Sequence, residues 1–117
     1  MRSATGLEIS RERVGAACVI TIGGEIDFDT AASLCKAANS CVDEVCVLDL
    51  TAVTFLGSAG LTALLESTAT ARDRGASLRI VVDGNQPVIR PIEITELDRD
   101  LALFHSVGEA LQARGFR

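Results

Sequence analysis

Aromatic residues are scarce in this 117-residue sequence, which has four Phe and neither Trp nor Tyr. The hydrophobic residues, 48% of the chain, are therefore mostly Val, Ile, Leu and Ala. This fraction, together with only 23% charged residues, is typical of a folded chain and argues against global disorder. A core of aliphatic side chains suits a small α/β domain in which helices cover the strands.

Long apolar runs are also missing from the sequence. No stretch is long enough to span a bilayer, and Met1 to Ser10 contains no continuous apolar segment of signal-peptide length. We therefore expect a cytoplasmic protein without a membrane partner. The length, with no internal repeat and no linker, predicts a single domain over residues 1–117.

The sequence has no stripe of basic residues. Eleven Lys and Arg against sixteen Asp and Glu give a net charge of −5, and the basic residues are dispersed along the chain. Proteins that bind nucleic acid usually concentrate positive charge on one face. The charge pattern therefore disfavours nucleic acid as a partner, and any role in transcription would be exerted through other proteins.

Motifs of enzymes are absent as well. The chain has neither a Walker A nor an H-E-x-x-H motif, and His105 is its only histidine. The segment Gly57 to Gly60 resembles a nucleophile elbow, but Leu56 occupies the position two residues before Ser58 where G-x-S-x-G requires glycine. We predict a protein that is not an enzyme and that uses no cofactor.

The four cysteines have no close CxxC spacing, and His105 is distant from them, so we expect no metal site. Cys18 and Cys46 lie in apolar, strand-like runs, which predicts buried side chains. Cys41 falls in a predicted loop, where we expect a thiol that reacts faster than these two. A reversible bridge between Cys35 and Cys41 is an open alternative.

The first third of the chain predicts two strands and a helix. Apolar residues at alternate positions indicate two strands between Leu7 and Ile22, separated near Arg11 to Arg13. Gly23-Gly24 predicts the following turn. A helix should then begin near Asp29 or Thr30.

A continuous apolar run follows, at Val45 to Leu50, and is typical of a central strand covered on both faces. Leucines at helical spacing after Ser58 predict a helix that ends at Gly75, with Ser58 as its N-cap. Phe55, Leu56 and Leu61 are candidates for an apolar contact patch around Ser58, but for Phe55 and Leu61 we expect core positions instead.

The remaining elements alternate in the same way. Ser77 to Val82 predicts a strand, and Pro87 suits the first turn of a helix that Pro91 should kink or shorten. Leu101 to Phe104 fits a last short strand, and Ser106 to Glu109 forms a capping box before a final helix. The order ββαβαβαβα predicts an α/β fold with a mixed, mainly parallel sheet and about four helices.

Three segments together form a family pattern. They are GEID at Gly24 to Asp27, LDLTAVTFLGSAGLTALL at Leu48 to Leu65, and ITELDRDLALFHSVGEAL near the C-terminus. The chain thereby resembles the STAS family of anti-sigma-factor antagonists over nearly its whole length. The resemblance implies a STAS-type fold for the predicted order of elements.

The resemblance also implies a phosphorylation site and the residues that bind a partner. The serine of the family's D-S-x-G pattern is Ser58 here, and it is implied to be phosphorylated by a serine kinase that is also the anti-sigma factor. Two positions depart from the family pattern, with Gly57 in place of an acidic residue and Glu96 in place of a glycine. The implied partner-binding residues are Asp27, Leu56, Gly57, Ser58, Ala59 and Gly60.

The implied function is that of an antagonist that binds an anti-sigma factor with a kinase-type ATP-binding fold and so frees a sigma factor. A serine phosphatase is the expected second partner. Phosphate at a helix start adds about −1.5 to −2 charges, which can block a partner without unfolding the domain. Two alternatives stay open: a scaffold without a phosphoswitch, which Gly57 favours, and a redox-modulated antagonist that uses Cys35 and Cys41.

Overall fold

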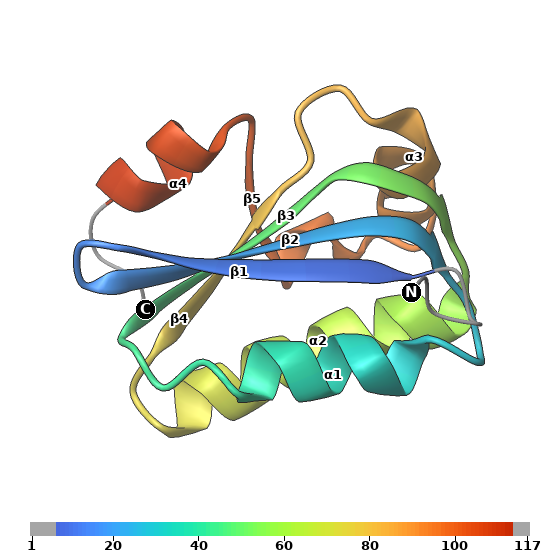
Figure 1. The fold of residues 1–117 in the computed structure, drawn as a ribbon. Helices are drawn as coiled ribbons and strands as arrows, with labels where there is room; N and C mark the ends of the chain where they lie inside the picture. The colour runs from blue at the N-terminus through green and yellow to red at the C-terminus, as the bar shows by residue number, and fades with distance from the viewer. Residues whose placement is uncertain (1–6, 114–117) are drawn as a thin grey trace.

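The computed structural model describes residues 7–113. Residues 1–6, which belong to the segment considered above as a signal peptide, and residues 114–117 lie outside the described residues. The structure confirms an α/β fold whose described residues form a mixed, mainly parallel sheet and four helices (Figure 1). The elements are β1 (Glu8–Val14), β2 (Ala17–Ile26), α1 (Ala31–Asn39), β3 (Val45–Leu56), α2 (Ser58–Asp73), β4 (Ser77–Val81), α3 (Gln86–Ile94), the 3₁₀ turn η1 (Leu97–Arg99), β5 (Ala102–Phe104) and α4 (Val107–Gln112).

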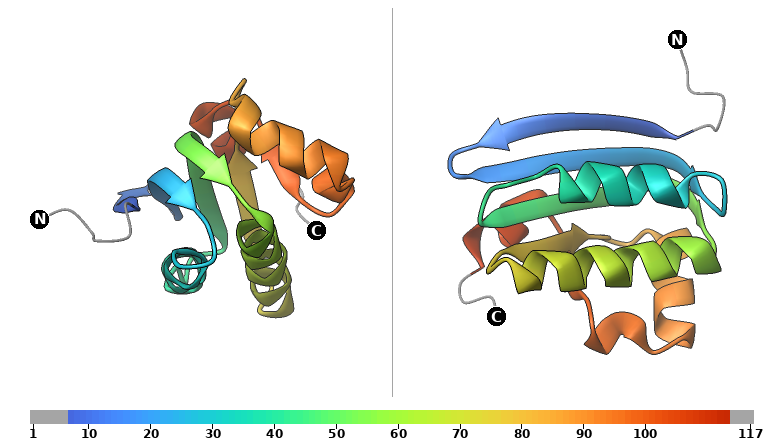
Figure 2. Two further views of the ribbon diagram at one scale, coloured as in Figure 1. Left: turned by 90° about the vertical axis from the view of Figure 1, so that its right-hand side faces the viewer. Right: turned by 90° about the horizontal axis from the view of Figure 1, so that it is seen from below.

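The five strands follow one another in the sheet in the order β1-β2-β3-β4-β5. β1 pairs with β2 antiparallel, and every later neighbour is parallel. Helices α1 and α2 run side by side along one face, while α3 and α4 lie on the other side of the strands (Figures 1 and 2). None of the helices between residues 7 and 113 combines the length and the apolar character needed to cross a membrane.

The core follows from the two-residue period of the strands. Ile20, Leu48 and Ile80 are aligned across β2, β3 and β4, and all three are fully buried in the larger hydrophobic cluster. Their chain neighbours Val19, Val47 and Val81 point to the opposite face, where α4 covers them. Apolar residues on both faces confirm that the run starting at Val45 is a central strand.

The first two strands form a hairpin, but its turn is not where the sequence predicted it. Arg11 to Arg13 lie within β1, and the chain reverses at Gly15, whose φ of 62° favours glycine. Every residue of β1 is exposed. An edge strand with no buried face leaves no pattern from which to locate its end.

The predicted turn at Gly23-Gly24 is also wrong, because both glycines lie inside β2. The β2–β3 pairing shifts register between Thr21 and Gly23 and again between Gly24 and Glu25. A Cβ atom on Gly23 would lie 3.4 Å from the Cβ of Ala52. The glycines thus accommodate irregular pairing and a close approach of two strands.

Several other boundaries agree with the sequence, although the strand predicted at Val45 to Leu50 continues to Leu56. Thr30 is the N-cap of α1, and Gly75, with φ of 78°, follows the C-terminus of α2. Pro91 lies inside α3 without ending it, since the helix continues to Ile94. Ser106 caps α4 by accepting a hydrogen bond from the Glu109 N–H at 3.0 Å.

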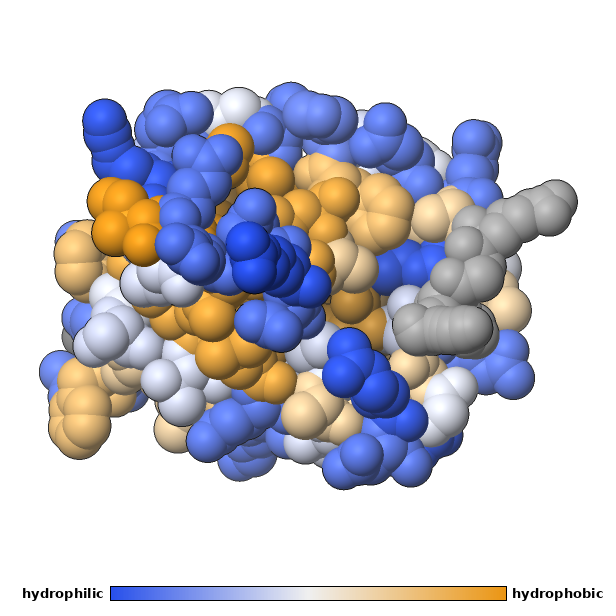
Figure 3. Space-filling model, turned by 180° about the vertical axis from the view of Figure 1, so that it is seen from behind, coloured by the Kyte–Doolittle hydropathy of each residue, from blue (hydrophilic) through white to orange (hydrophobic). Residues whose placement is uncertain are grey.

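The short strand β5 forms the second edge of the sheet. The face seen from behind carries an apolar area that is interrupted by hydrophilic side chains (Figure 3). A shallow hollow between α3 and β5 is lined by Ile92 and Leu103 together with the acidic residues Asp83, Glu93 and Asp98. A short strand beside charged side chains protects this edge from pairing with another chain.

Candidate functional site

The candidate site is the connection from β3 to α2, where Gly57 is the N-cap and Ser58 is the first helical residue. The prediction that Ser58 is the N-cap is therefore wrong by one position. Gly57 has extended backbone, and its N–H donates to the carbonyl of Ile26 at 2.9 Å. Its own carbonyl accepts the first helical hydrogen bond, from Leu61, at 3.0 Å. The end of β2 and the start of α2 are thus joined directly.

Burial divides the predicted partner-binding residues into two groups. Ser58 is exposed, and Gly57 and Ala59 are half-buried. Leu56 is only 4% exposed and Gly60 is buried, so the side of the chain that a partner could reach offers little of these two residues. Both residues support the loop from the core side, because β3 directs the Leu56 side chain into the core under the first turn of α2.

Gly60 is required by a close approach of two segments. A Cβ atom at this position would lie 2.6 Å from the Cδ1 of Leu56 and 2.7 Å from the Cγ2 of Ile26. Both distances are shorter than carbon atoms tolerate. Glycine at position 60 therefore lets the first turn of α2 pack against the end of β2.

Asp27 lies immediately after Ile26 and organises the turn into α1. Its Oδ1 accepts hydrogen bonds from the backbone N–H groups of Asp29 and Thr30, at 3.0 and 3.1 Å. The fully buried Thr30 hydroxyl accepts from the Asp27 N–H and donates to the Glu25 carbonyl, each at 2.8 Å. The Oδ2 atom of Asp27 has no hydrogen bond within residues 7–113. The carboxylate therefore fixes the turn into α1 through its Oδ1 atom.

Two phenylalanine side chains are exposed on the segments that the Gly57–Ile26 hydrogen bond joins. Phe28 is 87% exposed and Phe55 is 49% exposed, so the expectation that Phe55 is a core residue is wrong, whereas Leu61, at 7%, is confirmed as one. The sequence reasoning missed Phe28. The available signal was an aromatic residue in an otherwise acidic turn, between Asp27 and Asp29.

The start of α2 has a positive electrostatic character. The backbone N–H groups of Ser58, Ala59 and Gly60 precede the first helical hydrogen bond, and the first turn contains no acidic side chain. The helix is 16 residues long, so its dipole adds to this effect. A negative group placed on Ser58 would be stabilised there.

The cysteines are arranged differently from the prediction. Cys18 and Cys46 are buried as expected, but Cys41 is also buried, at 3% exposure, and only Cys35 is half-buried. Burial and then the neighbouring Cys41 thiol raise the pKa of Cys18 to about 11, and the same causes raise the pKa of Cys46 further. The Cys35 thiol instead lies 3.8 Å from the carbonyl of Ala63. Cys35 and Cys41 thus have different neighbours.

Residues 8–110 match the STAS domain, and the chain belongs to the STAS family. Over 97 residues it is 41% identical to the anti-sigma-F factor antagonist RsfB of two Mycobacterium tuberculosis strains, an alignment that covers 80% of this chain and 77% of RsfB. The crystal structure of an anti-sigma factor antagonist from Mycobacterium paratuberculosis aligns with a TM-score of 0.77 and 30% identity, over 95% of this chain and 96% of that one. The antagonist SpoIIAA in its unphosphorylated form shares the fold, with a TM-score of 0.63 at 17% identity over 89% of this chain and 93% of that one.

Proposed function

We propose that this protein is an anti-sigma-factor antagonist that binds an anti-sigma factor, frees a sigma factor and is inactivated by phosphorylation of Ser58. The antagonist role is supported by the 41% identity to RsfB. The observation that carries the switch is the position of Ser58, which is exposed on the first turn of α2 beside unpaired backbone N–H groups. We further propose that the chain folds as a single domain and acts by binding, without catalysis of its own.

The docking surface combines apolar and acidic groups. Phe28 and Phe55 supply exposed rings, and Glu25, Asp27 and Asp29 add negative charge on the neighbouring β2–α1 segment. We propose an anti-sigma factor of kinase-type ATP-binding fold that offers a complementary apolar surface with a basic rim. Exposed aromatic groups commonly supply most of the binding energy at such surfaces, and the charges accelerate association.

Phosphorylation would act on this surface without unfolding the domain. A phosphate on Ser58 carries about −1.5 to −2 charges, which the start of α2 stabilises through its N–H groups and dipole. The phosphate would also add bulk, and a charge that must lose its hydration, where the apolar surface of the partner packs against two aromatic rings. Binding would be lost, and a serine phosphatase would restore it by removing the phosphate.

One observation supports a second candidate, a scaffold of a signalling assembly without a phosphoswitch. Gly57 replaces the acidic residue that the family pattern has before the serine, and it leaves the N-cap of α2 without a side-chain hydrogen bond. A kinase that reads an acidic side chain at this position would act poorly on Ser58. The redox-modulated antagonist has less support, because Cys35 and Cys41 have different neighbours.

Titrations against the cognate anti-sigma factor test the proposal. Ser58→Ala should bind like the wild type and stay active after kinase and ATP are added, whereas the kinase-treated wild type should lose binding. Ser58→Asp should bind with intermediate affinity, since one carboxylate has less charge and fewer acceptor oxygens than phosphate. Equal binding by all of these proteins would leave the scaffold as the better function.

The matched control is Ser106→Ala, which removes another exposed serine at a helix start. Ser106 caps α4, so its loss should cost about 1 kcal/mol of stability and leave partner binding intact. Mass spectrometry of the kinase-treated protein should find the phosphate on Ser58 and not on Ser106. Thermal melts of each variant separate loss of binding from loss of fold.

A further inference from the structure

Two thiols and one carboxylate meet at the amino ends of β2 and β3, the end of the sheet opposite Ser58. The ligand atoms of Cys18, Cys41 and Asp43 all lie within 4.8 Å of one another. Cys18 comes from β2, and the other two come from the connection between α1 and β3. Cys46, on β3, is aligned with Cys18 in the parallel pairing and lies beside the Cys41 thiol.

We propose that Cys18, Cys41 and Asp43 bind a thiophilic divalent cation of the Zn²⁺ class. Zinc binds thiolate sulfur at about 2.3 Å and carboxylate oxygen at about 2.0–2.2 Å, so ligand atoms around one ion lie roughly 3.5–4 Å apart. Small inward shifts of three side chains on adjacent segments give this geometry. The donor set of sulfur and oxygen selects Zn²⁺ over Mg²⁺ or Ca²⁺.

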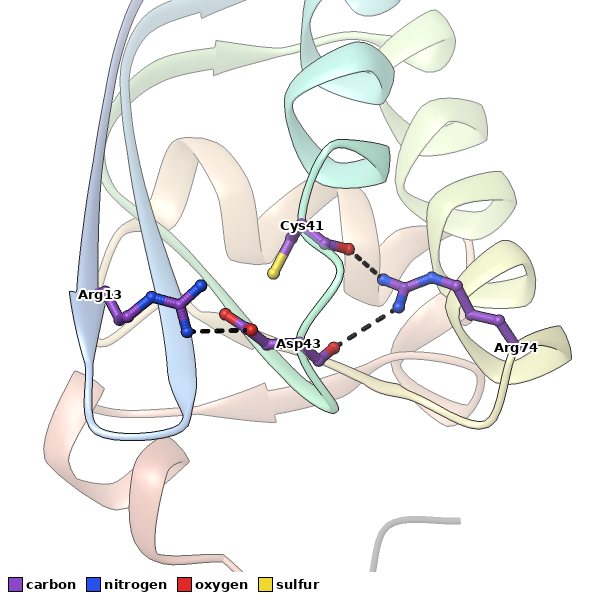
Figure 4. Close-up of polar contacts among 4 residues, drawn as sticks. All are labelled: Arg13, Cys41, Asp43 and Arg74. Carbon is purple, nitrogen blue, oxygen red and sulfur yellow. Dashed lines mark hydrogen bonds and ion pairs between the residues drawn. The ribbon is translucent and has the colours of Figure 1, made fainter.

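Arg13 and Arg74 lie beside the proposed ligands, and their positive charge would stabilise a metal centre with a net negative charge (Figure 4). Arg13 donates to the Oδ1 of Asp43 at 3.1 Å, which leaves Oδ2 without a donor among the described side chains. Arg74 donates to the backbone carbonyls of Cys41 and Asp43 and so holds the loop in place. Two thiolates, one carboxylate and a divalent cation leave a charge of about −1, which nearby guanidinium groups offset.

The site would join two parts of the fold. The connection between α1 and β3 is fastened to α2 by Arg74 and to β1 by Arg13. An ion would add a direct link from this connection to β2, as each ligating thiol releases its proton to solvent. The inference does not depend on the proposed function, because Ser58 follows the other end of β3.

Cobalt titration tests the site, with Co²⁺ as the spectroscopic probe for Zn²⁺. The reduced, chelator-treated full chain should develop a thiolate-to-cobalt charge-transfer band that saturates at one ion per chain. Added Zn²⁺ should abolish the band, and Zn²⁺ alone should raise the melting temperature with increasing concentration. Absence of the band in the reduced wild type would overturn the proposal.

Variants identify the ligands. Cys18→Ser and Cys41→Ser should each weaken cobalt binding at least about tenfold, and Asp43→Asn should weaken it without removing the thiolate band. Cys35→Ser is the matched control, since Cys35 is a half-buried thiol on α1 that contacts Ala63 instead. Equal loss in Cys35→Ser and Cys18→Ser would contradict the assignment. Asp43, which is not fully buried, supplies a variant that keeps the apolar core intact if the thiol variants fold poorly.

Discussion

The backbone N–H of Gly57 donates to the carbonyl of Ile26 at 2.9 Å and thereby ties the start of α2 to the end of β2. This bond brings the Asp27 turn and Ser58 together, although 30 residues separate them in the chain. The strand pairing has the same effect, since Ile26, next to Asp27, pairs with Leu56, two residues before Ser58, in the parallel register. The geometry of the candidate site therefore depends on the pairing of β2 with β3 as well as on the loop between β3 and α2.

Gly60→Ala should destabilise the protein, because its Cβ would clash with Leu56 and Ile26. Overpacking of this kind typically costs about 1–3 kcal/mol, measured as the change in the free energy of unfolding in urea. Gly108→Ala is the control, since the nearest atom to its Cβ is 3.9 Å away and the residue lies in helix α4. Alanine there should stabilise by roughly 0.5–1 kcal/mol. Equal effects of the two substitutions would disprove the close approach at Gly60.

Thr30→Val should lower the free energy of unfolding by about 1–3 kcal/mol, because it leaves the Asp27 N–H and the Glu25 carbonyl without their hydroxyl partner. Valine keeps the shape of the buried side chain, so the loss reports the hydrogen bonds. Thr30→Ser keeps the hydroxyl and should cost less than valine does. Chemical denaturation measures both, and a serine variant that is less stable than the valine variant would show that packing matters more.

The sequence predicted the buried framework well, because Val45 to Leu50 and the leucines of α2 carry strong apolar patterns. It failed where no face is buried, as in the exposed strand β1, and where glycines serve pairing irregularities instead of turns, as at Gly23. Neither case leaves a periodic signal in the chain.

The site was predicted unevenly for a related reason. Ser58 was proposed from its motif, but the exposure of Phe28 and the burial of Cys41 depend on how β2, α1 and β3 pack. Spacing along the chain also gave no sign of a metal site, since Cys18 and Cys41 are 23 positions apart. Only the tertiary fold places them together with Asp43.

Gly57→Asp should stabilise α2 and improve Ser58 as a kinase substrate. Aspartate at an N-cap accepts hydrogen bonds from the first helical N–H groups, which is worth a few tenths of a kcal/mol over glycine. The new Cβ would lie 3.1 Å from the Phe55 ring, which is half-exposed and free to turn aside.

Gly57→Ala separates these two effects, because it adds the same Cβ without a capping group. It should be less stable than the aspartate variant in thermal melts. Phosphorylation rates with the cognate kinase, measured on wild type and both variants, should be highest for aspartate. A rate unchanged by aspartate would mean that the kinase does not read position 57.

The four thiols of the reduced, metal-free protein should react with an alkylating reagent in a defined order. Cys35 should react first, since it is the only half-buried thiol of the four. Cys18 and Cys41 should follow slowly, and Cys46 should be slowest, because it is fully buried and its raised pKa leaves little thiolate. Mass spectrometry of peptides after brief labelling gives the ranking. Labelling of Cys41 ahead of Cys35 would contradict the structure of the α1–β3 connection.

Glu96→Gly should stabilise the protein, because Glu96 has a left-handed backbone with φ of 61° at the position where the family commonly has glycine. That conformation costs a side-chain-bearing residue about 1–2 kcal/mol, and the extra freedom of glycine in the unfolded chain costs roughly 0.5–1 kcal/mol. The net gain should be about 0.5–1 kcal/mol, visible as a melting temperature a few degrees higher. Glu93→Gly is the matched control, since Glu93 is an exposed residue of helix α3 where glycine should cost about 1 kcal/mol. Opposite signs for the two Glu-to-Gly substitutions are expected, and a loss of stability in both would show that the left-handed turn at Glu96 carries no strain.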